Sequence, residues 1–354
     1  MALKHITSGE NTIYVSPFME LGFKIITLDC QEVLGGKISS GRIGMIFDGK
    51  NEEAQKAITE QESVDIDLGT VKRGTCLKIH GVISHRNYLL NRFWIDFLCV
   101  PSIDFLTRRG QLIYDSLDSA IKSLWKGTVE IRTSSEITDG IEINQAGEYD
   151  SKFLGTLCGS YKKDSVFALG LDRLLIKDLI GIGSAGNNEK TDPLPLVSGT
   201  KLISTEDNRP FSINYDYRLY TFPETWLQSE NLEAKGINHK YRLIHRDHSV
   251  LRENLFNNQK LYFSKMYSQL KVSNTRGLLD YRLGDVVGYR IAGNTDKTPY
   301  SNDTKYIISK IVYHYSTEST DNKQNNIPFK QEYTLHCLEE KGVVLNDKDP
   351  KEEK

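Results

Sequence analysis

Cysteine is scarce in this chain and is never clustered. The five cysteines are Cys30, Cys76, Cys99, Cys158 and Cys337, each in an apolar context with no second cysteine or histidine at metal-site spacing. This scatter excludes a disulfide-rich scaffold and a zinc finger. We expect buried, reduced thiols that pack as small hydrophobic side chains.

Long hydrophobic runs are also absent. The first ten residues contain no apolar core of the kind that a signal peptide has. The most apolar segment, Phe93 to Val100, is interrupted by Asp96 and is far too short to span a bilayer. We therefore expect no membrane insertion and a chain that folds in the cytoplasm.

Neither sign of charge dominates. The 354 residues include 45 Lys and Arg against 47 Asp and Glu, which gives a formal net charge of −2 at pH 7. No overall field would draw such a protein onto nucleic acid or an anionic membrane. With 38% hydrophobic and 26% charged residues, the composition is that of a soluble globular protein long enough for two or three domains.

Common catalytic motifs are missing as well. The chain has no Gly-x-Ser-x-Gly elbow and no phosphate-binding Gly-x-x-x-x-Gly-Lys-Ser/Thr loop. Gly181 to Gly186 have dinucleotide-loop spacing, but a polar segment follows where a helix would have to begin, so we interpret them as a linker. His245 and His248 could share a helix face, yet Arg246 stands where a zinc protease needs Glu. We predict no enzyme and no catalytic, cofactor-binding or metal-ligating residue.

Short strands dominate the first hundred residues. Runs rich in β-branched and aromatic residues alternate with glycine-containing turns, a pattern typical of a small barrel or sandwich. The predicted strands are Phe23 to Asp29, Ile43 to Asp48, Val64 to Leu68, Leu77 to Ile83 and Phe93 to Leu98. A helical turn from Glu52 to Thr59 is expected between the second and the third.

After Pro101 the hydrophobic period becomes helical. Apolar residues recur at helical spacing from Gly110 to Lys126 and from Asp150 to Tyr161, which predicts two helices. Asp150 can cap the second, because a short oxygen-bearing side chain accepts a bond from a free first-turn N–H. Four further strands are predicted, at Val129 to Arg132, Ile141 to Asn144, Ser165 to Leu169 and Leu174 to Lys177.

Strand patterns return in the last third of the chain. We predict strands at Phe211 to Thr221, Tyr281 to Ile291, Lys305 to Ser316 and Phe329 to Leu338. A helix from Ser249 to Leu270 is predicted to interrupt them and to end before Gly277. Leu283-Gly-Asp285 predicts a tight turn into an apolar strand. The charged residues from Asn346 to Lys354 are expected to be disordered.

Three segments resemble one protein family. Gln145-Ala-Gly-Glu-Tyr-Asp-Ser-Lys-Phe-Leu154 is similar to the family's Q-x-x-E-S-D-x-x-F segment that starts a helix, with Tyr149 replacing the serine. Leu283 to Val287 loosely matches its L-x-x-G-D turn, and Tyr306 to Tyr315 is similar to its Y-x-V-x-x-V-x-H strand. The chain thus resembles the baseplate or tail hub proteins of contractile-tailed phages. That family is shared with the N-terminal half of the type VI secretion valine-glycine-repeat spikes and with the late-control D proteins.

The resemblance implies a mainly β fold with an α/β insert and two tube-forming β-barrel domains. The implied division is 1–101 for the first tube barrel, 102–182 for the α/β domain, 183–235 with 278–342 for the second tube barrel, 236–277 for a helical insert and 343–354 for a disordered tail. Strand edges left open in one barrel can be covered by a neighbour, and a cyclic interface closes without growing into fibres.

The resemblance also implies a structural function. The chain would be a homotrimeric symmetry adaptor in the virion baseplate, assembled in the host cytoplasm. Its partners would be the hexameric tail tube, the trimeric tail spike and other baseplate proteins, and DNA would pass its central channel without specific binding. One alternative is the hub of a bacterial contractile injection or type VI-like secretion system. A less favoured one is a cytosolic metal-dependent hydrolase with a site around His245, Asp247 and His248.

Overall fold

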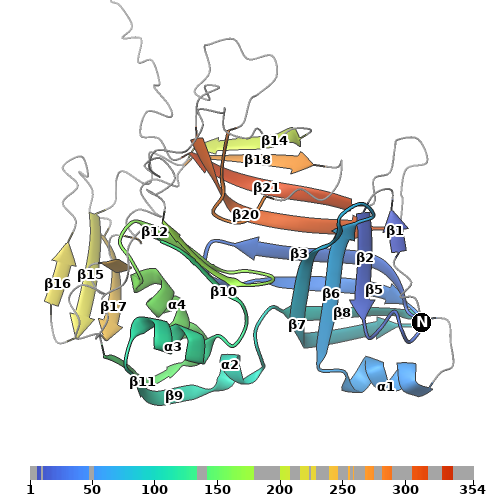
Figure 1. The fold of residues 1–354 in the computed structure, drawn as a ribbon, viewed down its shortest axis with the longest axis horizontal. Coiled ribbons are helices and arrows are strands. Elements are labelled where there is room, and N and C mark those ends of the chain that lie inside the picture. The colour runs from blue at the N-terminus through green and yellow to red at the C-terminus, as the bar shows by residue number, and fades with distance from the viewer. Residues whose placement is uncertain are drawn as a thin grey trace, which may run out of the picture.

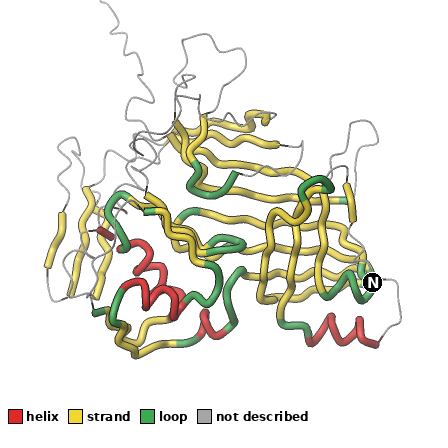
Figure 2. Tube along the Cα trace, viewed as in Figure 1, coloured by secondary structure: helices red, strands yellow, loops and turns green. Residues whose placement is uncertain are grey.

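The computed structural model describes residues 6–8, 11–47, 52–133, 142–178, 200–207, 216–222, 225–228, 239–245, 254–255, 258, 268–274, 281–288, 305–317 and 329–337. Most of these residues are in strands, and the helices gather mainly on one side of the molecule (Figure 1, Figure 2). The mainly β fold class with a smaller α/β region is confirmed.

One twelve-stranded sheet runs through the molecule (Figure 1). Its first part contains β1 (Ile6–Ser8), β2 (Asn11–Ser16), β6 (Ser63–Thr70), β7 (Gly74–Leu89), β8 (Arg92–Leu98), β5 (Ser40–Ile46) and β3 (Lys24–Val33), in this order. It continues through β20 (Lys305–Ser316), β21 (Phe329–Cys337), β18 (Ser268–Asn274) and β14 (Thr200–Asp207), with β19 (Val286–Gly288) also paired to β20. The two predicted strand regions therefore share a single sheet.

Alternating burial explains how the sheet curls around its core. Inward positions such as Leu28 and Ile95 are fully buried, whereas their sequence neighbours are partly exposed. The Phe97 ring packs directly against the backbone of Gly41 and Gly81. A Cβ atom on these glycines would lie only 2.4 and 2.5 Å from the ring. The long strand β7 turns the corner, because its first half pairs with β6 and its second half with β8. Helix α1 (Glu52–Glu60), as predicted, lies between β5 and β6.

A separate α/β unit packs around its own core. Its sheet has the order β10 (Val129–Arg132), β13 (Leu174–Asp178), β12 (Ser165–Leu169) and β4 (Gly35–Ile38), so the first strand region contributes one strand. Its helices are α2 (Asp104–Thr107), α3 (Leu117–Leu124) and α4 (Asp150–Ser160), beside a ribbon of β9 (Arg109–Tyr114) and β11 (Ile143–Tyr149). Buried side chains from α3 and α4, among them Ile121 and Leu157, fill this core.

Three sequence predictions need correction. The helix predicted from Gly110 to Lys126 begins only at Leu117, because residues 109–114 pair with β11 and leave Ile113 64% exposed. The end of the helix predicted from Ser249 to Leu270 is wrong, because β18 begins at Ser268. The strand predicted from Tyr281 is restricted to Val286–Gly288 among the described residues, since a turn precedes it. Isolated apolar periodicity does not distinguish these cases.

The remaining described strands form a small sheet in the order β16 (Thr225–Gln228), β15 (Asp216–Phe222) and β17 (His239–His245). Of the predicted strand Phe211 to Thr221, residues 211–215 lie outside the described part of the chain, as does the predicted tail from Asn346 to Lys354. Cys30, Cys99 and Cys158 are buried free thiols, and Cys76 is half-buried. Within the described ranges, no helix combines the length and the apolar character that crossing a membrane needs.

Candidate assembly site

Strands β3 and β20 join the first strand region of the chain to the last one. Seven residue pairs connect them, from Lys310 opposite Val33 to Ser316 opposite Thr27. We call this pairing the seam. Because it connects strands almost three hundred residues apart, it decides how the second strand region is placed against the first.

Glu32 lies at the seam on the buried side. Its side chain accepts a hydrogen bond of 3.0 Å from the Tyr313 hydroxyl on β20 and one of 3.4 Å from the Leu171 backbone N–H in the turn of the α/β unit. Burial raises the pKa of Glu32 to about 7, and the nearby Asp172 carboxylate acts in the same direction. Arg282 and both hydrogen bonds oppose that shift. The Glu32 carboxyl on β3 therefore links the first strand region to β20 and to the α/β unit.

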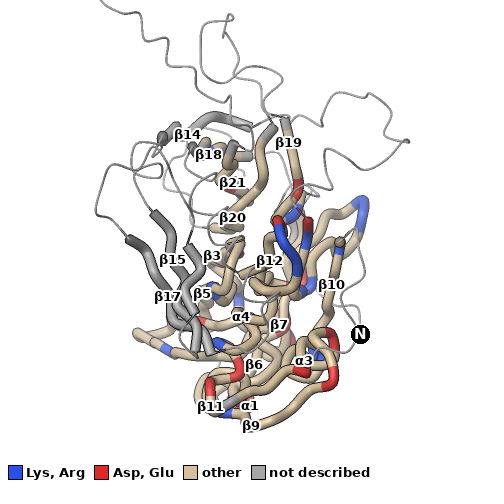
Figure 3. Tube along the Cα trace, turned by 90° about the vertical axis from the view of Figure 1, so that its left-hand side faces the viewer, with Lys and Arg blue, Asp and Glu red and all other residues tan. Residues whose placement is uncertain are grey.

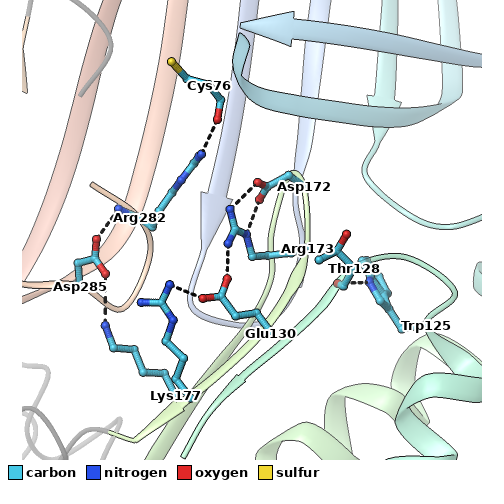
Figure 4. Close-up of polar contacts among 10 residues, drawn as sticks. Cys76, Trp125, Thr128, Glu130, Asp172, Arg173, Lys177, Arg282 and Asp285 are labelled. Carbon is cyan, nitrogen blue, oxygen red and sulfur yellow. Dashed lines mark hydrogen bonds and ion pairs between the residues drawn. The ribbon is translucent and has the colours of Figure 1, made fainter. Parts of the chain in front are cut away.

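Ion pairs and one hydrogen bond to the backbone extend this junction along the α/β unit (Figure 4). Lys177 on β13 lies 3.2 Å from the Asp285 carboxylate, and the Arg282 guanidinium donates to the Cys76 carbonyl at 2.8 Å. Arg173 bridges Asp172, at 2.8 Å, and Glu130. These contacts bind β13 and β7 to the segment before β19, so they orient the α/β unit against the long sheet.

The turn before β19 has the geometry that its sequence predicts. Gly284 has a φ of +74°, in the left-handed region that glycine adopts at little cost. The Asp285 carboxylate accepts the Arg282 backbone N–H at 2.8 Å, which closes the turn. The predicted tight turn at Leu283-Gly-Asp285 is therefore confirmed.

The segment from Gln145 to Asp150 holds the start of α4 in a way that differs from the prediction. Tyr149 occupies the cap position and its side chain makes no capping bond, so the cap predicted at Asp150 is wrong. The buried Asp150 carboxylate instead accepts bonds from Arg108, at 2.6 Å, and from Gln145, at 2.8 Å. Gln145 is itself fully buried, and Tyr114 donates to it at 3.2 Å. The motif is a buried polar network that supports the fold.

One histidine of the hydrolase alternative, His245, lies in a strand. His245 is the last residue of strand β17, while Asp247 and His248 lie outside the described residues, as do Gly181 to Gly186. In the part of the chain that the structure describes, no three His, Cys, Asp or Glu residues are grouped so that they could hold a metal ion.

Sequence reasoning missed Glu32 and its partners. A lone glutamate at the end of an alternating strand gives no local sign of burial, since its position is set by Tyr313 and Leu171, which are distant in sequence. The only available signal was its even spacing from the buried Leu28 and Cys30.

Comparison with known proteins identifies the fold. No protein family and no curated protein matches the sequence. The solved structures that resemble it include the type VI secretion component c3393 of E. coli, which shows structural similarity to the bacteriophage T4 tail proteins gp27 and gp5. That match has a TM-score of 0.55 and 12% identity, over 93% of this chain and 77% of the other.

Two tail proteins match over nearly their whole length. The tail protein of Neisseria meningitidis has a TM-score of 0.55 and 10% identity, over 92% of this chain and 96% of its own. The 43 kDa tail protein of prophage MuSo2 from Shewanella oneidensis has a TM-score of 0.53 and 9% identity, with the same coverage of 92% and 96%. The chain therefore has the fold of phage tail proteins and of a type VI secretion component, in agreement with the resemblance seen in its motifs.

Proposed function

We propose that the protein is a structural baseplate hub of a phage tail. It acts as a homotrimeric symmetry adaptor that joins the hexameric tail tube to the trimeric spike, and its central channel lets DNA pass. The shared fold with phage tail proteins supports the tail role. The observation that carries the ring is the long sheet, in which, among the described residues, the second half of β7 and the strand β14 each pair on one side only.

Eight strands follow one another from the second half of β7 to β14. Among the described residues, residues 85–89 of β7 pair with β8 alone, and β14 pairs with β18 alone. An open edge presents unpaired backbone groups that another strand can satisfy. Tyr88 and Leu89 on the β7 edge are 69% and 65% exposed, which suits an edge that a second copy covers.

The size of such a ring suits a channel. If three copies each contribute these eight strands, about 24 strands spaced roughly 4.8 Å apart would span about 115 Å around and about 37 Å across, even without strand tilt. Barrels of about 16 to 18 strands already enclose an aqueous channel. Each chain contributes two strand regions to its sheet. Three copies would therefore present six similar segments around the ring.

The proposal extends to domains, partners and location. The division is 1–101 and 183–235 with 278–342 for the tube barrels, 102–182 for the α/β domain, 236–277 for an insert and 343–354 for a tail. The partners are the tail tube, the tail spike and other baseplate proteins, in the virion baseplate, after assembly in the host cytoplasm. The hub has no enzymatic activity, no cofactor and no membrane insertion.

The same fold supports a second candidate. The similarity to c3393, a component of the type VI secretion system, favours the hub of a bacterial contractile injection or type VI-like secretion system. That hub would share the ring and differ in what passes through it.

Native mass spectrometry and negative-stain imaging test the ring. We expect a trimer with a central hole for the purified chain, alone or with its tube and spike proteins. A variant with Tyr88→Lys and Leu89→Lys on the open edge should be monomeric, because like charges on an edge oppose strand pairing. The matched control is Lys122→Glu on the exposed face of α3, which should remain trimeric. A monomer under all conditions would refute the ring.

A further inference from the structure

One strand of the α/β unit has an uncovered edge. Among the described residues, β9 pairs with β11 alone, so its other edge offers backbone groups to a further strand. We call this the β9 edge. It lies at the lower border of the α/β unit in two perpendicular views (Figure 1, Figure 3). Leu112 and Ile113 in this strand are 49% and 64% exposed, and a two-stranded ribbon with exposed apolar residues favours pairing with another strand.

Opposite charges stand at the two ends of the β9 edge. Arg109 is the first residue of β9 and Asp115 is the first residue after it, and both are exposed. Side chains alternate along a strand, so Arg109, Gln111 and Ile113 share one face, and Asp115 continues this series. A base at one end, an acid at the other and apolar residues between them make the edge complementary to an antiparallel copy of itself.

One register of such a pair uses both features. If Leu112 of one copy lies opposite the partner's Leu112, then Arg109 lies opposite the partner's Asp115 and the same pair forms again at the other end. The two Ile113 side chains are then diagonal neighbours on the same face. A two-fold pair centred one residue earlier or later would place Arg109 opposite Ile113 or Leu117. The charges therefore select the register that is centred on Leu112.

Tyr149 holds Arg109 in place beside the β9 edge. The Arg109 guanidinium lies 4.5 Å from the centroid of the Tyr149 ring and donates to the Tyr149 hydroxyl at 2.9 Å. Tyr149 is 41% exposed and stands where the motif of the tail hub family has a serine. Stacking on an aromatic ring orients a guanidinium without neutralising its charge. The departure from the motif thus supports the cation that a second copy would meet.

We infer that the β9 edge is a self-complementary dimerisation surface, on which β9 of a second copy pairs antiparallel and Arg109 binds the partner's Asp115. The two ribbons then form one four-stranded sheet. The contact is isologous, so it closes after two copies and covers an edge that would otherwise promote aggregation. It does not depend on the proposed ring. A monomer becomes a dimer through this contact, whereas a trimer carries three such edges and becomes a hexamer of two rings.

Two charge variants test the pairing by native mass spectrometry over a concentration series. Arg109→Asp alone and Asp115→Arg alone should each weaken the contact by at least about tenfold, because two attractive pairs become repulsive. An equimolar mixture, with one variant labelled with ¹⁵N, should form mixed pairs within a few-fold of the wild-type affinity, because opposite charges face each other again. One chain that carries both substitutions should likewise pair as wild type does. Tyr149→Ser should weaken the contact without abolishing it.

The matched control pair is Lys56→Asp and Glu60→Arg, at exposed positions of α1. These variants change the net charge by the same amounts, and each should associate as wild type does. Wild-type protein that forms neither dimer nor hexamer would overturn the inference, as would a mixture that pairs no better than its two components. A trimer that does not pair further would overturn the β9 contact and leave the ring intact, whereas a dimer without trimers would do the reverse.

Discussion

Replacing the buried Glu32 with glutamine should make the protein more stable at alkaline pH. The two donors bind different oxygens of Glu32, so the single oxygen of glutamine can accept the Leu171 N–H while its amide nitrogen donates to the Tyr313 hydroxyl oxygen, and glutamine carries no charge. The folded pKa of Glu32 is about 7, above its ordinary value of 4.5. Its ionised form is therefore the one that the fold disfavours, and the substitution removes that form.

The sign and the size follow from linkage. Between pH 4.5 and 7 the folded carboxyl holds more protons than the unfolded one, so its contribution to stability is fully present below pH 4.5 and is lost as pH rises to about 7. A shift of this size corresponds to about 3 kcal/mol of unfolding free energy. Relative to wild type, Glu32→Gln should thus gain up to about 3 kcal/mol between pH 4.5 and pH 8.

Urea unfolding at several pH values, at one protein concentration, measures this difference. Subtracting wild type from variant cancels the other titrating groups, which both proteins share. Gln55→Ala on the exposed face of α1 serves as control, because it adds and removes no titrating group, and it should give a difference that does not change with pH. A difference between Glu32→Gln and wild type that is equally flat would refute the account of a neutral carboxyl at the junction.

Three further predictions concern the packing of the fold. Gly41→Ala should cost about 1–3 kcal/mol in urea unfolding, because the new Cβ would lie 2.7 Å from the Asp29 carbonyl and would also overlap the Phe97 ring. Asp150→Ala should cost about 1–3 kcal/mol, because its buried carboxylate is the acceptor for both Arg108 and Gln145. Leu90→Asn should raise the thermal midpoint by an amount equivalent to about 0.5–1 kcal/mol, because Leu90 is 96% exposed at a φ of +57° that asparagine tolerates better.

Matched variants serve as controls for the first two of these measurements. Gly36→Ala should be nearly neutral, since the nearest atom to its new Cβ is 3.7 Å away. Asp104→Ala, on an exposed position of α2, should change stability far less than Asp150→Ala. If Gly41→Ala were as mild as its control, or if Leu90→Asn lowered the midpoint, the local geometry described for these positions would be wrong.

Local pattern was informative wherever one face of an element is buried. The alternation of β3, β6 and β20 and the helical period of α4 are visible in the sequence because each side chain's environment there repeats with the backbone period. The failures occur where that link breaks. Ile113 is exposed on a two-stranded ribbon, so its apolar character suggested a helix that the chain does not form there.

The sequence by itself determined the mainly β class, most strand positions in the first hundred residues and the three motifs that resemble tail hubs, because these depend on residues close together in the chain. Only the tertiary structure decided that β3 pairs with β20, that Glu32 is buried between three parts of the fold, and that residues from His85 on β7 to Lys330 on β21 lie opposite one another across six strands. Register between distant strands depends on which surfaces bury each other, and a slip of one residue would send every side chain to the opposite face.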